Sequence, residues 1–163
     1  MSEADHTSPQ QDLEDILHHT QPRSLLYAGE GLSPLVEKWR RENPGTLTEA
    51  LPREAPHKAF PLSRLYDLAL VADTLEHLSG ADGRLLLGQL RNMGAQRMAV
   101  LDPVDSPWRF RDFIGLGFVR QQCYDQQGGL TLYTYDIASY NHKRTWNNPQ
   151  NWANPEMWDK ARW

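Results

Sequence analysis

Residues 66–78 read YDLALVADTLEHL, and this stretch decides the fold class of the chain. Its first part is almost continuously apolar, which is typical of a strand buried on both faces of a parallel sheet. Polar side chains follow at once, beginning with Asp73 and Thr74. The stretch therefore predicts a central strand over 66–73, with Asp73 at its carboxyl end.

Other segments repeat this pattern on both sides of the central strand. Residues 24–29 (SLLYAG) and 97–102 (RMAVLD) are also short apolar runs, and they predict two more buried strands. Residues 45–50 (GTLTEA) and 57–62 (HKAFPL) are less apolar strand candidates. Helices are predicted before and between the strands, because serines that can cap a helix N-terminus stand at Ser8, Ser33, Ser79 and Ser106.

The pattern changes toward the C-terminal part of the body. Residues 118–125 and 130–137 flank a Gln-Gln-Gly-Gly turn, which predicts an antiparallel hairpin. Strand–helix alternation followed by a hairpin predicts an α/β fold, a three-layer sandwich with a mostly parallel sheet. The expected organisation is an N-terminal segment with a short helix (1–22), an α/β domain (23–138) and a Trp-rich C-terminal extension (139–163).

Composition and charge narrow the class of protein. The 163 residues carry a net charge of -4, and no apolar run approaches the roughly 20 residues of a membrane span. The single cysteine excludes an internal disulfide, and neither cysteine nor histidine spacing predicts a metal site. The acidic N-terminus lacks the basic and apolar regions of a signal peptide. We therefore expect a cytoplasmic protein that does not enter a membrane.

A glycine loop follows the first predicted strand. Residues 27–33 read YAGEGLS, in which Gly29 and Gly31 permit a tight turn and close approach of a ligand to the backbone. The free N–H groups of the next helix suit a nucleotide or amino-acid ligand. In an α/β sandwich, ligands bind beyond the carboxyl ends of the strands, near the switch in strand order. This loop and the Asp73 segment are therefore the candidate ligand-binding elements.

The stretch 66–78 resembles the fourth-strand segment of class I S-adenosylmethionine-dependent methyltransferases. The match includes Asp67 at the start of the strand, Asp73 at its end and the Glu-His-Leu that follows. The order of the other segments is similar too, from the glycine loop to the GLGF (115–118) that enters the hairpin. The resemblance spans Ser24 to Ile137 and implies a Rossmann-like sandwich of the methyltransferase type.

This resemblance implies binding of S-adenosylmethionine and methyl transfer to an acceptor that the sequence does not identify. The residues that it places around the cofactor are Tyr27, Gly29, Glu30, Gly31, Glu49 and Asp73. Asp73 and His77 are the candidate bases for an acceptor that must lose a proton. The loop departs from the family's acid-x-Gly-x-Gly-x-Gly, since Tyr27 replaces the acid and Ser33 the third glycine. These changes favour an alternative, an inactive interaction module that uses the C-terminal tail.

The tail is unusually aromatic, with four of the six tryptophans between Trp146 and Trp163. Packed over the α/β body, such rings stabilise a fold by about 25 cal/mol per Å² of buried apolar surface. They can equally form a lid, or a surface for a protein partner or a second copy of the chain. Aromatic rings with basic residues nearby could also stack on RNA bases, but the acidic body disfavours nucleic acid as the partner. We expect the tail to pack over the body.

Overall fold

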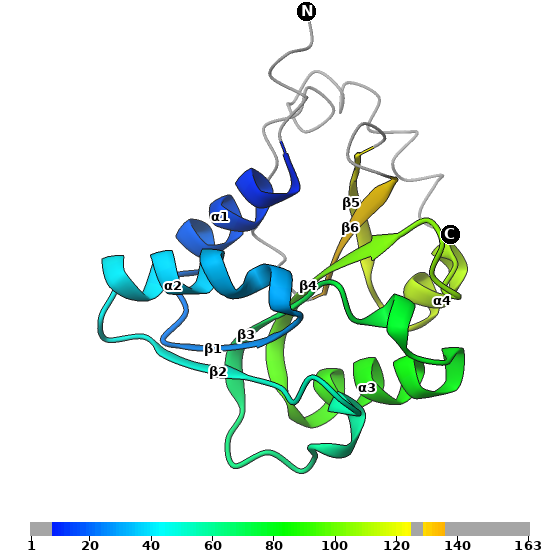
Figure 1. Cartoon of the computed structure of the whole chain (residues 1–163), viewed down its shortest axis with the longest axis horizontal. Helices are drawn as coiled ribbons and strands as arrows, with labels where there is room; N and C mark the ends of the chain where they lie inside the picture. The colour runs from blue at the N-terminus through cyan, green and yellow to red at the C-terminus, as the bar shows by residue number, and fades with distance from the viewer. Residues whose placement is uncertain (1–7, 125–128, 136–163) are drawn as a thin grey trace, which may run out of the picture.

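A mixed sheet forms the centre of the molecule (Figure 1). The computed structural model describes residues 8–124 and 129–135. Within them the strand order is β2-β1-β3-β4-β6-β5. The first four strands in this order are parallel, whereas β6 runs antiparallel to both of its neighbours. The strands are β1 (Ser24–Ala28), β2 (Leu47–Ala50), β3 (Tyr66–Val71), β4 (Ala95–Pro103), β5 (Val119–Tyr124) and β6 (Leu130–Tyr135).

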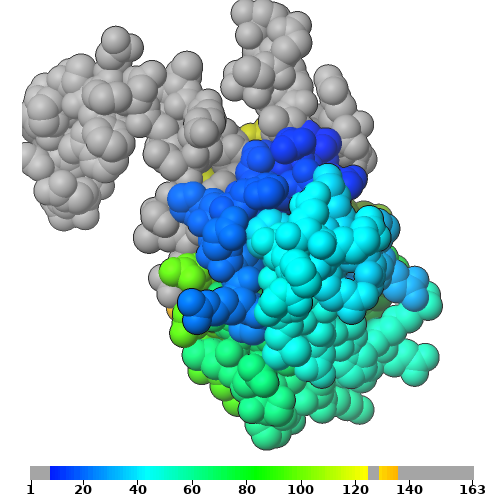
Figure 2. All heavy atoms as spheres, turned by 90° about the vertical axis from the view of Figure 1, so that its left-hand side faces the viewer, coloured from blue at the N-terminus to red at the C-terminus, as the bar shows by residue number. Residues whose placement is uncertain are grey.

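Helices cover both faces of this sheet, so the predicted three-layer α/β architecture is confirmed (Figure 1). Helices α1 (Pro9–Thr20) and α2 (Ser33–Glu42) lie on one face, and α3 (Gly80–Met93) and α4 (Phe110–Gly115) lie on the other. Figure 2 shows α1 and the cyan end of α2 side by side at the surface. Helix α1, which was predicted within a separate N-terminal segment, packs into the same hydrophobic cluster as α2.

Strand β3 shows why the central apolar run is continuous. Leu68 and Leu70 pack against the cluster under α1 and α2, whereas Ala69 and Val71 pack against the cluster under α3 and α4. Successive side chains of a strand point to opposite faces, and here both faces are covered. The prediction of a strand buried on both sides is therefore confirmed.

Two of the four predicted caps are confirmed. The Ser8 and Ser79 hydroxyls accept hydrogen bonds from the first turns of α1 and α3, at 3.0 and 3.1 Å. Helix α2 begins at Ser33 itself, because a short 3-10 turn (Glu30–Leu32) precedes it. The prediction for Ser106 is wrong, since α4 begins only at Phe110 and the Ser106 hydroxyl donates to Asp102 Oδ1 at 2.6 Å.

Strand β2 forms one edge of the sheet, and the further strand that the sequence pattern suggested over 57–62 is absent from the described residues. The candidate strand 57–62 is not a strand, and a 3-10 turn (Pro56–Lys58) begins this segment instead. Strand β2 has only four residues, none of them buried. The predicted Trp-rich extension, with its basic residues, lies outside the described residues. No helix in the described part of the chain has the length and apolar character needed to cross a bilayer.

Candidate functional site

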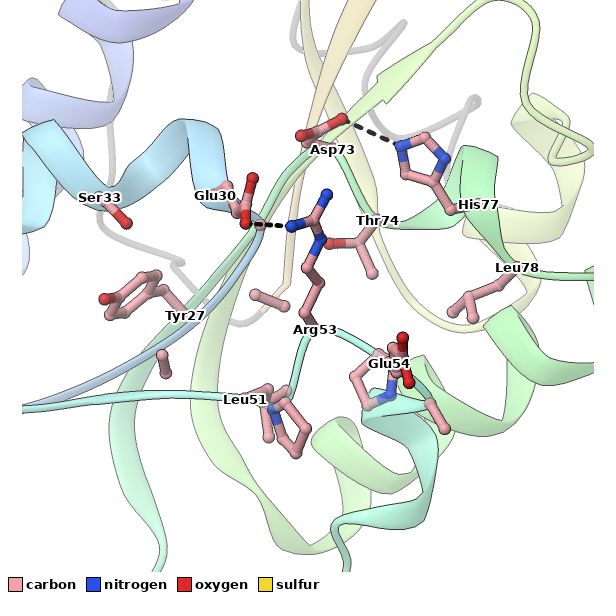
Figure 3. Close-up of a pocket in the computed structure, with 16 residues that line it drawn as sticks. Tyr27, Glu30, Ser33, Leu51, Arg53, Glu54, Asp73, Thr74, His77 and Leu78 are labelled. Carbon is pink, nitrogen blue, oxygen red and sulfur yellow. Dashed lines mark hydrogen bonds and ion pairs between the residues drawn. The ribbon is translucent and has the colours of Figure 1, made fainter.

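A cavity lies at the switch point of the sheet, where strands that follow β1 lie on both sides of it. Strand β2 is added on one side of β1 and β3 on the other, so the carboxyl ends of β1 and β3 flank the switch point. A cavity of about 600 Å³ lies at these ends (Figure 3). It is lined by residues 27–30 and 33, by the last residue of β2 and the segment 51–56 that follows it, and by residues 73, 74, 77 and 78. Ligands of open α/β sheets bind at such a position.

Gly29 shapes one wall of this cavity. Its φ of +120° lies in a region that other residues rarely adopt. A Cβ at this position would lie 1.7 Å from the carbonyl oxygen of Ala72, the residue just after β3. By contrast, a Cβ on Gly31 would meet no atom within 4 Å. The first glycine of the loop is therefore required by the packing of the two strand ends, and the second is not.

Two charged side chains meet across the cavity (Figure 3). The Arg53 guanidinium, from the segment after β2, contacts the Glu30 carboxylate of the glycine loop, with Nη1 and Oε2 separated by 2.6 Å. Both side chains are exposed, Arg53 to 79% and Glu30 to 63%. The pair thus links the two walls through solvent-exposed atoms.

A second polar group lies in the turn after β3. Asp73 adopts a left-handed backbone conformation with φ of +54°, and its Oδ1 lies 3.2 Å from His77 Nε2 (Figure 3). The Thr74 hydroxyl donates to the Ala72 carbonyl at 2.8 Å and so ties the turn to the strand end. In the part of the chain that the structure describes, Asp73, Glu76 and His77 bring one donor atom each within 4.8 Å of one another. These are side chains that could contact a divalent cation.

Two carboxyl groups near this turn have shifted pKa values. Burial raises the pKa of Glu76, and the nearby Asp73 carboxylate raises it further. Burial also raises the pKa of Asp102 to about 6, against the effect of the hydrogen bond from Ser106. Asp102 lies at the carboxyl end of the buried strand β4, and Asp73 lies just beyond the end of β3, so a polar residue after an apolar run is a signal that both share.

The structure brings most of the predicted site residues together, with two exceptions. Tyr27, Gly29, Glu30, Asp73 and His77 all line the cavity, whereas Gly31 and Glu49 do not.

The position of Glu49 follows from strand register. Glu49 pairs with Leu26, whose side chain belongs to the cluster under α3 and α4. There the Glu49 carboxylate accepts a hydrogen bond from the Tyr66 hydroxyl. Burial, followed by this hydrogen bond, raises the pKa of Tyr66 to about 12.

Arg53 was not predicted to belong to the site. It follows a short exposed strand, and no pattern in the sequence shows where its side chain points.

Solved methyltransferase structures share this fold. Magnesium protoporphyrin IX methyltransferase from Synechocystis PCC 6803, solved with bound S-adenosylmethionine, is 13% identical with a TM-score of 0.51 and 77% coverage of both chains. A putative O-methyltransferase from Nostoc punctiforme PCC 73102 is 16% identical, and an O-methyltransferase family protein from Burkholderia thailandensis is 10% identical. Each of these two has a TM-score of 0.54, and the match covers 77% of this chain but only 55% of the other. The fold is therefore the Rossmann-like fold of methyltransferases.

Sequence comparison places the chain more narrowly than this fold does. None of the curated proteins matches it in sequence. A sequence profile described as "Family of unknown function (DUF6231)" matches residues 7–163, which is almost the whole chain. The chain therefore belongs to the DUF6231 family.

Proposed function

We propose that the cavity binds S-adenosylmethionine and that the protein transfers its methyl group to an acceptor. The observation that carries this proposal is the position of the cavity, at the carboxyl ends of β1 and β3 where the strand order switches. The same fold occurs in a methyltransferase solved with bound S-adenosylmethionine. Ligand sites of doubly wound α/β folds lie at this point of the sheet.

The residues present fit this ligand. A cavity of about 600 Å³ is within the range of small-molecule sites. Its walls combine apolar side chains with the carboxylates of Glu30, Glu54 and Asp73, which complement a positively charged ligand. When bound, the cofactor supplies an electrophilic methyl group on a sulfonium. Because Gly29 has no side chain, the loop packs directly against the carbonyl of Ala72 at the end of β3, and this packing fixes the wall against which the ligand would lie.

Asp73 and His77 are the residues best placed to handle a proton. Their side chains line the cavity and lie 3.2 Å apart, so the carboxylate can orient the imidazole. The unprotonated ring nitrogen of a neutral imidazole can accept a proton. We assign this pair the role of base for an acceptor whose nucleophilic atom carries a proton. For other acceptors the protein needs only to orient the two reactants.

One observation favours a second function, that of a methyltransferase-like fold that binds partners instead of the cofactor. Glu49 was the acid expected to hold the ribose, yet its carboxylate bonds to Tyr66 away from the cavity. A protein that has lost its cofactor would show this loss of a binding residue. The two functions differ in a single measurable property, the affinity for S-adenosylmethionine.

Calorimetric titration with S-adenosylmethionine and S-adenosylhomocysteine tests the proposal. We expect binding at micromolar ligand that is lost in Ala50→Trp, because Ala50 lines the cavity and an indole there would fill it. The matched control is Leu47→Trp, on the same strand but outside the cavity, which should bind like the wild type. Absence of heat at millimolar ligand from the folded wild-type protein would refute the proposal and leave the interaction module.

A further inference from the structure

Negatively charged side chains outnumber positively charged ones in the lining of the cavity. Among the described residues that line it, Arg53 is the only lysine or arginine, whereas Glu30, Glu54 and Asp73 are carboxylates. Arg53 reaches from the segment after β2 to Glu30, on the opposite wall (Figure 3). Each wall of the cavity therefore presents one charge of the pair to the same region of space.

The fold does not need this pair. Both side chains are largely exposed, and exposed ion pairs contribute little to folding because water and salt screen them. For the same reason the pair opens at little cost when another charged group is offered. The two side chains are therefore available to a ligand that enters the cavity.

A ligand that opens the pair must satisfy both of its members. An α-amino acid group carries a carboxylate and an ammonium on one carbon, and so matches an arginine and a glutamate that lie 2.6 Å apart. The planar guanidinium can donate two parallel hydrogen bonds to the carboxylate. The Glu30 carboxylate can accept hydrogen bonds from the ammonium. Each charge then exchanges its protein partner for a ligand partner, and none is left unpaired.

We infer that Glu30 and Arg53 form a clamp for the α-amino acid end of the ligand, with Arg53 on the carboxylate and Glu30 on the ammonium. The inference rests on the proposed function, because S-adenosylmethionine carries such a group. It adds a specificity. A ligand without the carboxylate leaves Arg53 unpaired if it opens the clamp, and a ligand without the whole amino acid leaves the clamp closed.

Three ligands separate these cases in a calorimetric titration of the full chain. S-adenosylmethionine has both charged groups, decarboxylated S-adenosylmethionine lacks the carboxylate, and 5′-methylthioadenosine lacks the amino acid. We expect Arg53→Gln to lower the affinity for S-adenosylmethionine about tenfold, because the variant loses a charged hydrogen bond to the carboxylate. The same variant should change the affinity of the other two ligands less than about twofold, because neither contacts Arg53. Arg53→Lys should fall between Gln and the wild type, since an ammonium cannot make the bidentate contact.

The control variant is Arg111→Gln, which removes the same charge from an exposed position of α4 outside the cavity. It should leave all three affinities unchanged. If Arg53→Gln lowers the affinity for all three ligands equally, or for none of them, the clamp is refuted while the proposed function stands. If none of the three binds to the wild-type protein, the proposed function fails and the clamp fails with it.

Discussion

The two walls of the cavity differ in what holds them in place. The wall formed after β1 and β3 is fixed by backbone packing, since Gly29 lies against the carbonyl of Ala72 at a distance that allows no side chain. The wall formed after β2 follows a four-residue strand without a buried residue, and Arg53 reaches across from it through solvent. The first wall is therefore held by the core of the sheet, whereas the second has few packing contacts to hold it. The Glu30–Arg53 pair is a contact between the two.

The largest expected effect is on the fixed wall. Gly29→Ala should lower the free energy of unfolding by about 4 kcal/mol, because it adds backbone strain at φ +120° and a clash with Ala72. Gly31→Ala should change it by less than about 0.5 kcal/mol, since open space surrounds that position. Urea denaturation of the two variants measures the difference. Equal stabilities would contradict the contrast between the two glycines.

A smaller loss is expected when the strands behind the walls are compared. Leu70→Ala in β3 should cost about 3 kcal/mol, because Leu70 is fully buried and its loss leaves a cavity in the core. Leu47→Ala in β2 should cost about 0.5 kcal/mol, since that side chain is 42% exposed. The midpoints of chemical denaturation report both. A cost at Leu47 as large as that at Leu70 would mean that β2 is as firmly packed as β3.

The buried end of β4 predicts a dependence of stability on pH. Burial raises the pKa of Asp102 to about 6 in the folded protein, from the ordinary value of 3.8 that applies to the unfolded chain. The folded state therefore binds this proton more tightly, and the resulting stabilisation is fully present below pH 3.8. It is lost as the pH rises through about 6, with a total change of about 3 kcal/mol.

Asp102→Asn isolates this contribution, because an amide does not titrate in that range. The wild type should lose stability relative to the variant between about pH 4 and pH 7, as measured by urea denaturation at several pH values. A difference between the two proteins that stays constant over this range would show that Asp102 titrates at its ordinary pKa when folded.

The smallest expected effect is that of the ion pair on the fold. Glu30→Gln and Arg53→Gln should each change the free energy of unfolding by less than about 0.5 kcal/mol, because both side chains are exposed. Thermal denaturation without ligand measures this change. A loss above about 1 kcal/mol would show that the pair stabilises the cavity wall and is not free to open for a ligand.

The buried elements could be predicted from the sequence because their signals are local. The apolar runs at 24–29, 66–73 and 97–102 have no polar face, so they predict buried strands whatever their neighbours are. The caps at Ser8 and Ser79 depend only on residues within one turn, and both are present. Tyr27, Gly29, Glu30 and Asp73 line the cavity for a related reason, since each lies at or just beyond the carboxyl end of a buried parallel strand, and His77 follows in the 3-10 turn (Leu75–His77) after β3.

The exposed elements could not be predicted in the same way. The side on which Glu49 lies depends on the register of β2 against β1, and a shift of one residue would reverse it. Ser106 has a cap signature, yet its hydroxyl donates a hydrogen bond to the nearby Asp102 and the helix begins at Phe110. In this case one local interaction, with a residue four positions earlier, replaces another, the helix cap.

The sequence by itself determined the class of fold and the loops that line the cavity after β1 and β3, because burial patterns and glycine positions act over short distances. Only the tertiary structure decided which charges face the cavity. Glu49 turns away from it and Arg53 turns toward Glu30, since both outcomes depend on how β2 aligns with β1. Strand register and long-range charge contacts have no local signature, so the chain must fold before they exist.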